Sequence, residues 1–111
     1  MLKLEIKMDD QKMIKDKKYK PESVYKVIDD LFQRYHLRKE IKADGTHVFY
    51  GTGDRKDYGS FGFLITSLRE WEWFMEYVVK WIWYNSDRGH TEDDFSVEDV
   101  LYYYTKKESI L

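Results

Sequence analysis

Two loop segments carry the residue types that most directly suggest ligand chemistry. The first, Asp87–Asp99, is rich in acidic and imidazole groups: Asp87, His90, Glu92, Asp93, Asp94, Glu98 and Asp99. Carboxylates at this density suit Ca²⁺ or Mg²⁺, but counting from Asp87 or from Asn85 does not give the ligand spacing of an EF-hand loop. The pattern favours a solvated acidic loop that leads into a helix N-terminus, where negative charge is stabilising. We therefore expect no metal site and no cofactor.

The second loop is the glycine-containing run Gly51-Thr52-Gly53-Asp54-Arg55-Lys56. It follows an expected strand and precedes an expected helix, which is the setting of a phosphate-binding loop. It completes neither G-x-G-x-x-G nor the G-K-[ST] ending, so a flexible loop is the better interpretation. A small-ligand or metal-dependent enzyme is a second alternative, and it requires the 51–56 and 87–94 loops to meet at one pocket.

No catalytic residues are predicted. The histidines at positions 36, 47 and 90 are isolated, and the sequence contains no H-E-x-x-H helix motif and no G-x-S-x-G turn. Cysteine is absent, which excludes disulfides, a thiolate nucleophile and cysteine-ligated metal sites.

A lysine-rich segment suggests nucleic-acid binding as an alternative function. Its cations are Lys12, Lys15, Lys17, Lys18 and Lys20, with Tyr19 and Tyr25 nearby as rings on which bases could stack. Residues 1–42 carry twelve Lys/Arg against eight Asp/Glu, whereas residues 43–111 carry seven against thirteen. The resulting charges of +4 and −6 give a chain of net charge −2 whose second half repels phosphate. The charge balance therefore disfavours nucleic acid as a partner, and attraction between two solvated faces explains the asymmetry more simply.

The strongest pointer to function is an aromatic segment. Seven of the fourteen residues from 71 to 84 are aromatic: Trp71, Trp73, Phe74, Tyr77, Trp81, Trp83 and Tyr84. If residues 70–85 form one helix, Glu72, Glu76 and Lys80 share a charged stripe at i, i+4 and i+8. Trp83 then projects from the middle of this stripe and Trp73 from its edge.

These five residues are the predicted protein-binding site: Trp73, Trp83, Glu72, Glu76 and Lys80. Tryptophan and tyrosine dominate the energetics of protein interfaces, so exposed rings among charges suggest contact with another protein or a second copy of this chain. In the alternative, the C-terminal helix with Tyr102–Tyr104 folds over Trp83 and covers it within the monomer.

The elements that must position these residues begin with a strand and a helix. Residues 2–8 alternate apolar and charged side chains, which predicts a strand with one buried face. Pro21 suits the first turn of a helix, and the apolar spacing from Val24 to Tyr35 extends that helix to about His36. Residues 11–20 favour no single structure.

A β-hairpin is expected next, with Asp44-Gly45 as a two-residue type I′ turn. This turn pairs Ile41 with Val48 and places both on the face of the first strand that carries Leu4 and Ile6. From Ser60 the apolar spacing favours a helix, with a strand as the alternative. The last helix is predicted to begin at an N-cap Ser96.

Together these expectations describe an α+β fold in the order β-α-β-β-α-α-α: a three-stranded antiparallel sheet against three to four helices, in one domain over residues 1–111. No run of about 18 apolar residues and no signal-peptide pattern is present, so we expect a cytoplasmic protein with no membrane association. The predicted function is that of a small, bacterial-type, non-catalytic protein-interaction module.

Overall fold

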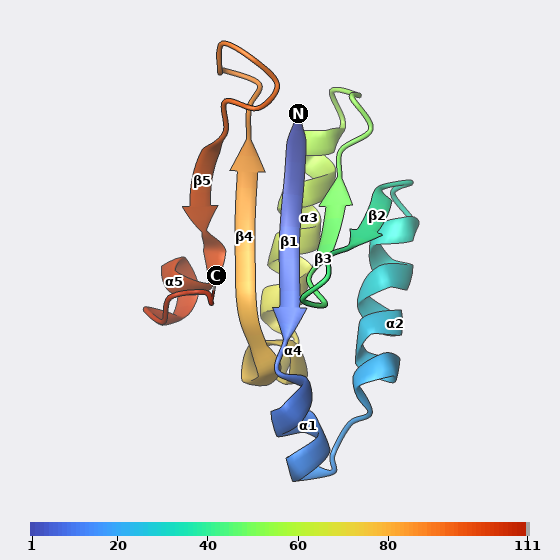
Figure 1. The fold of residues 1–111 in the computed structure, drawn as a ribbon. Coiled ribbons are helices and arrows are strands. Elements are labelled where there is room, and N and C mark those ends of the chain that lie inside the picture. The colour runs from blue at the N-terminus through green and yellow to red at the C-terminus, as the bar shows by residue number, and fades with distance from the viewer. Residues whose placement is uncertain (111) are drawn as a thin grey trace.

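The computed structural model describes residues 1–110 and confirms the α+β class (Figure 1). The elements of this part are β1 (Leu2–Met8), α1 (Asp10–Asp16), α2 (Pro21–Gln33), β2 (Arg38–Ile41), β3 (His47–Tyr50), α3 (Asp57–Glu70), α4 (Glu72–Tyr77), β4 (Val78–Asn85), β5 (Ser96–Asp99) and α5 (Val100–Thr105). Their strands form one antiparallel sheet in the order β2-β3-β1-β4-β5. The predicted three-stranded sheet is wrong, because β4 and β5 add two strands where helix was expected.

The predicted first strand is confirmed and lies at the centre of the sheet. β1 pairs with β3 on one side and with β4 on the other. Its even-numbered side chains, Leu2, Leu4, Ile6 and Met8, all lie in the main hydrophobic cluster. Because side chains alternate along a strand, the odd-numbered ones face the opposite side of the sheet.

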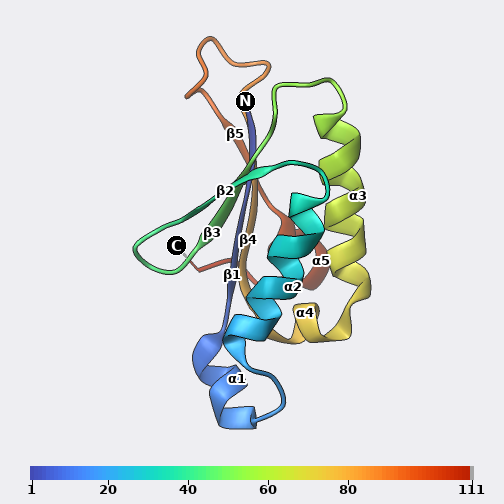
Figure 2. The same ribbon diagram turned by 90° about the vertical axis from the view of Figure 1, so that its right-hand side faces the viewer.

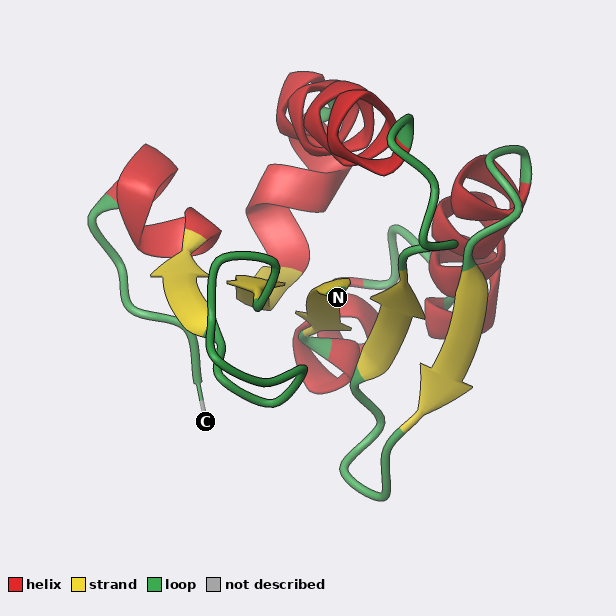
Figure 3. Cartoon of the chain, turned by 90° about the horizontal axis from the view of Figure 1, so that it is seen from above, coloured by secondary structure: helices red, strands yellow, loops and turns green. Residues whose placement is uncertain are grey.

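Helices α2, α3, α4 and α5 cover one face of the sheet (Figures 2 and 3). Phe32 of α2 stacks on Phe49 of β3 with ring centroids 4.0 Å apart, and Trp81 of β4 lies fully buried. The opposite face is partly covered by the β2–β3 hairpin tip and by the segment after α5, where the Ile110 amide donates to the Val79 carbonyl. None of the helices in residues 1–110 is both long and apolar enough to cross a membrane.

The hairpin forms, but its predicted register is wrong by one residue. The observed pairs are Ile41 with His47 and Glu40 with Val48. The Gly45 amide donates to the Lys42 carbonyl and the Lys42 amide to the Thr46 carbonyl, so the loop has three residues and Gly45 adopts a φ of 88°. A one-residue shift moves the side chains of one strand to the other face relative to its partner. Val48 therefore lies on the face that carries Glu5, whereas Ile41 stays on the face of Leu4 and Ile6 and is exposed there on the edge strand.

The predicted helix over residues 70–85 is also wrong in its second half. It ends at Tyr77, and Val78–Asn85 continues as the strand β4 between β1 and β5. This half is an almost unbroken run of β-branched and aromatic residues, which pack well on a pleated surface. Trp81 and Trp83 pair with Ile6 and Leu4, so they face the helices, whereas Lys80 and Ile82 face the other way.

The last predicted helix begins three residues later than expected. Residues 96–99 pair with β4, and Asp99 rather than Ser96 is the N-cap, since its carboxylate accepts from the Tyr102 amide at 3.2 Å. The same carboxylate accepts from the Ser109 amide at 2.8 Å and the Ser109 hydroxyl at 2.6 Å. Two segments are also defined more clearly than the sequence allowed: α1 (Asp10–Asp16) takes up the first part of residues 11–20, and residues 57–70 are helical.

Candidate functional site

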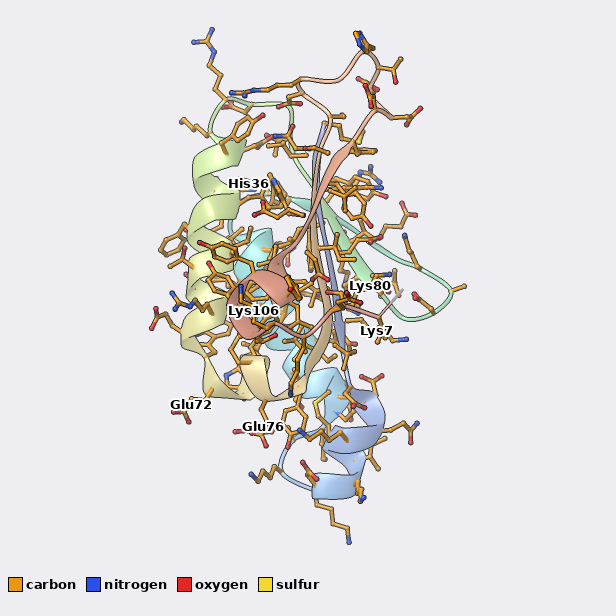
Figure 4. The ribbon with its side chains drawn as sticks, turned by 90° about the vertical axis from the view of Figure 1, so that its left-hand side faces the viewer. Lys7, His36, Glu72, Glu76, Lys80 and Lys106 are labelled. Carbon is orange, nitrogen blue, oxygen red and sulfur yellow. The ribbon has the colours of Figure 1, made fainter. Side chains whose placement is uncertain are left out.

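The five residues of the predicted protein-binding site do not share one surface. Glu72 and Glu76 lie on α4 at one end of the molecule, whereas Lys80 lies on the sheet face opposite the helices (Figure 4). Trp73 and Trp83 lie on the helix side of the sheet but in separate hollows. The charged stripe at i, i+4 and i+8 required a continuous helix, and that helix ends between Glu76 and Lys80.

Trp73 lies in a small apolar hollow between α4 and α2. Its ring stacks on Trp71 with centroids 5.0 Å apart. The hollow has a volume of about 170 Å³ and is lined by Tyr19, Ser23, Val24, Val27 and Trp73. The lining contains no charged group, and Tyr19 and Ser23 supply its hydroxyls, so the hollow offers mostly apolar contact area.

Lys80 belongs to a buried charge cluster on the other face of the sheet. Its ammonium lies 3.8 Å from Glu5 Oε1, 3.4 Å from Thr46 Oγ1 and 3.9 Å from Asp44 Oδ2. Glu5 also forms an ion pair with Lys42, and it accepts a 2.6 Å hydrogen bond from the Tyr84 hydroxyl. The Lys80 side chain is only 8% exposed, so it is not a surface charge available to a partner.

This cluster perturbs the acid–base behaviour of its members. Burial by itself would raise the pKa of the Glu5 carboxyl, but hydrogen bonds from Lys42 and Tyr84 and the charge of Lys80 outweigh burial and lower that pKa. Burial and the bond to Glu5 raise the pKa of the Tyr84 hydroxyl. Glu5 therefore remains ionised and matched by cations, which is the arrangement of a structural network.

The lysine-rich segment packs against α4. Lys12 donates to the Glu76 carbonyl at 3.3 Å and lies over the Tyr77 ring, and Lys18 lies 3.7 Å from the Glu76 carboxylate. The Tyr77 hydroxyl donates to Asp16, and burial together with that carboxylate raises the pKa of Tyr77 to about 12. Lys15, Lys17 and Lys20 are exposed. Two of the five predicted nucleic-acid-binding cations thus contact this chain's own α4.

The two chemistry-bearing loops do meet. Gly51, Thr52, Gly53 and Asp54 line one pocket of about 300 Å³ with Met1, Leu2, Asp57, Asp87 and Glu92. The buried Asp57 carboxylate accepts from the Thr52 hydroxyl at 2.7 Å and the Gly53 amide at 2.9 Å, so it holds the glycine loop in place. Within residues 1–110 no three acidic or histidine side chains are grouped to hold a metal ion. The loops share a pocket, but its one buried carboxylate is already committed to the loop.

Trp83 forms part of a different feature, which we name the aromatic groove. This groove lies between α3 and α5 and has a volume of about 300 Å³; its lining residues are Tyr58, Phe61, Gly62, Ile65, Trp83, Glu98, Val100, Tyr103 and Tyr104. Phe61 packs edge-on against Trp83 with centroids 4.8 Å apart. Tyr58 and Tyr103 are 49% and 65% exposed and form its accessible rim.

Local features of α3 and α5 place the walls of the groove. α3 contributes Gly62 to the lining, and the space beside it is open, since a Cβ built at this position meets no atom within 4 Å. Asp99 caps α5 and begins the helix immediately after β5, so Tyr103 and Tyr104 project beside β4. The prediction that Tyr102–Tyr104 fold over Trp83 describes this arrangement in part: Trp83 is half-buried, and a groove remains beside it.

The groove has a distinct electrostatic character. Its lining contains five aromatic rings and one charged group, the Glu98 carboxylate, with no lysine or arginine. The face of an aromatic ring carries negative charge density and attracts cations. The chain already uses one of these rings in this way, because the Arg69 guanidinium lies 4.7 Å from the centroid of the Tyr104 ring.

Sequence reasoning identified Trp83 and, as the alternative, its cover by Tyr102–Tyr104, but it missed the partners of Trp83 from α3. Phe61 and Ile65 belong to the apolar spacing of the predicted helix, and that spacing carries no information on which strand the helix covers. Only the pairing of β4 between β1 and β5 brings Trp83 between these helices. Comparisons with protein-family models, with curated proteins and with solved structures find no match to this chain.

Proposed function

We propose that this protein is a non-catalytic binding module whose aromatic groove takes up a lysine or arginine side chain presented by a partner protein. The observation that carries the proposal is the lining: five rings and one carboxylate, with no lysine or arginine among the lining residues, while Arg69 lies over the Tyr104 ring. Of the sequence-predicted residues the proposal retains Trp83, and it replaces the helical stripe by residues of α3, β5 and α5.

Shape and chemistry both favour a long cationic side chain. The aliphatic stem of lysine or arginine buries well against apolar surface while its charged end stays near polar groups. In the groove the stem would contact Phe61 and Ile65, and the charge would lie between Glu98 and the rim tyrosines. A desolvated cation–π contact contributes about 2 kcal/mol, and a carboxylate at the rim adds attraction that salt screens.

The overall charge distribution supports the same class of partner. Residues 43–111, which supply every side chain of the groove, carry a net charge of −6. A basic segment is therefore attracted to this half of the chain before contact, which raises the association rate at low salt. Tryptophan and tyrosine, the residue types that most often dominate interface energetics, form most of the groove.

The test is selection from a random twelve-residue peptide library on the immobilised protein, followed by titration of the recovered peptides. We expect enrichment of lysine or arginine beside apolar residues, and a loss of affinity of at least tenfold when the basic residue is replaced by norleucine. Tyr103→Ala, which removes an exposed rim ring without touching the buried core, should weaken binding by a similar factor.

Trp73→Leu is the matched control, since it changes a tryptophan in the other hollow and should leave the affinity unchanged. Recovery of peptides with no basic preference, or binding that Tyr103→Ala leaves intact while Trp73→Leu abolishes it, would contradict the proposal.

A further inference from the structure

The second surface with a defined chemistry is the outer edge of β2. β2 is an end strand of the sheet, and all four of its residues are exposed (Figures 1 and 3). An edge strand presents unpaired backbone N–H and C=O groups to which another strand can bond. Ile41, an exposed apolar residue at 55%, lies on this edge.

The hydrogen-bond pattern identifies which backbone groups point outward. The Lys42 amide donates to the Thr46 carbonyl at 2.9 Å, so Lys42 is directed toward β3. Backbone direction alternates along an antiparallel strand, and Arg38 and Glu40 are therefore also directed toward β3. The N–H and C=O groups of Lys39 and Ile41 point away from the sheet.

The side chains of β2 carry a self-complementary charge pattern. Arg38 and Glu40 lie on the sheet face opposite the helices, where Arg38 covers the Tyr50 ring at 4.2 Å and lies 3.6 Å from Glu40. Lys39 projects to the helix side, where its ammonium is 2.7 Å from the Asp29 carboxylate. Its charge is thus already matched within the chain.

We propose that β2 pairs antiparallel with β2 of a second copy of this chain, with the twofold axis at Lys39. In this register the outward backbone groups of the two Lys39 residues bond to each other. Arg38 of each copy then faces Glu40 of the other, which gives two intermolecular ion pairs. Ile41 lies opposite Leu37, and the two sheets join edge to edge.

Charge favours this register over its two neighbours, because the two Lys39 residues that meet at the axis are each already paired with Asp29 of their own chain. An axis at Glu40 brings two glutamates together and places Arg38 opposite Lys42. An axis at Arg38 brings two arginines together. Like charges directly opposite each other destabilise paired strands, whereas opposite charges stabilise them. A contact confined to one short edge is small, so we expect a concentration-dependent dimer.

Sedimentation equilibrium from 10 µM to 1 mM tests this pairing with charge-reversed variants. The native chain should shift from 13.6 kDa toward twice that mass as concentration rises. Arg38→Glu and Glu40→Arg each create two like-charge contacts and should weaken self-association at least tenfold. A mixture of these two variants restores opposite charges in both contacts and should form a heterodimer.

A variant that changes the backbone of β2 tests the same strand pairing independently of charge. Lys39→Pro removes the outward N–H at the axis without removing a bond to β3, so it should abolish dimerisation while circular dichroism shows the fold retained. The proposal is overturned by a monomer at every concentration, or by a dimer that persists in both charge-reversed variants. A mixture of the two variants that fails to associate would also overturn the assigned register.

Discussion

The buried pair of Lys80 and Glu5 predicts an asymmetric response to charge removal. In Glu5→Gln, Lys80 stays 8% exposed and keeps only Thr46 at 3.4 Å and the half-exposed Asp44 at 3.9 Å. In Lys80→Met, Glu5 still has its Lys42 ion pair and the 2.6 Å hydrogen bond from Tyr84. Loss of the carboxylate should therefore cost far more stability than loss of the ammonium.

The magnitude follows from the distance. Two unit charges 3.8 Å apart attract by about 4 kcal/mol at an effective dielectric constant of about 20. Leaving one member of a buried pair alone costs about 3–5 kcal/mol. With an unfolding entropy of about 2.1 cal/mol/K per residue, a loss of about 3 kcal/mol lowers the Tm of this chain by about 13 °C. For Lys80→Met we expect a decrease below about 6 °C.

Thermal and urea unfolding, followed by tryptophan fluorescence, measure the stability of both variants, because Trp81 is fully buried and follows Lys80 in β4. The double variant Glu5→Gln/Lys80→Met should be more stable than Glu5→Gln alone, since the unpaired cation is gone. Lys26→Met, which opens an exposed pair with Asp30, is the control and should leave Tm unchanged. The reasoning is refuted if Glu5→Gln is no more harmful than Lys80→Met.

Three further perturbations have defined outcomes. The pKa values of the Glu5 and Asp29 carboxyls are lowered in the folded state. Their contribution to stability is therefore fully present above the pKa values of the unfolded chain and is lost as pH falls through the folded-state values. Urea midpoints should decline below about pH 4.5, and they should decline less in Glu5→Gln. Gly51→Ala places a Cβ 2.7 Å from the buried Asp57 carboxylate and should destabilise the fold by about 1–3 kcal/mol. Gly59→Ala places a Cβ in open space on α3 and should stabilise the fold by about 0.5–1 kcal/mol. Urea unfolding measures both changes. Asp99→Ala removes the α5 cap and both bonds to Ser109, and hydrogen exchange should show faster exchange of the Trp81 amide, which donates to the Ser109 hydroxyl.

The local sequence pattern predicts an element correctly where a single apolar periodicity is clear. β1 alternates strictly and forms as predicted, and α2 begins at Pro21 with a consistent apolar stripe but ends at Gln33, before the predicted end near His36. The segment from Trp71 to Tyr84 misleads because rings at many positions satisfy helical spacing. The adjacent Val78 and Val79, followed by aromatic residues, were the local signal for a strand. Pairing on both sides by β1 and β5 then makes β4 a central strand.

The hairpin error has a different origin. Asp44-Gly45 is compatible with a two-residue turn, but it also fits a three-residue loop in which only Gly45 has positive φ. The choice fixes which side of the sheet receives Val48, and the sequence around the turn does not distinguish the two loops. Ile41 keeps the face of Leu4 and Ile6 in the observed register, but it lies exposed on the end strand β2.

The aromatic groove lay beyond sequence reasoning because its walls come from α3, β4, β5 and α5. Trp83 was singled out for a reason that the fold removes, since it was placed on a charged helical face, and Tyr102–Tyr104 entered only as the alternative that covers it. Glu98 was read as part of an acidic loop, whereas it is the groove's one charged group. Sites that are assembled from distant segments depend on topology, and here the topology depends on a strand predicted as a helix.

The most direct test of cation uptake by the aromatic groove is ¹⁹F NMR on protein labelled with 5-fluorotryptophan, with the four resonances assigned by single Trp→Phe variants. During titration with a selected lysine- or arginine-containing peptide, the Trp83 resonance should move in a saturable way. The Trp73 resonance should stay in place, and the norleucine version of the peptide should cause at least tenfold weaker shifts. A Trp83 resonance that is insensitive to the basic peptide, or equally sensitive to both peptides, would contradict cation recognition at this groove.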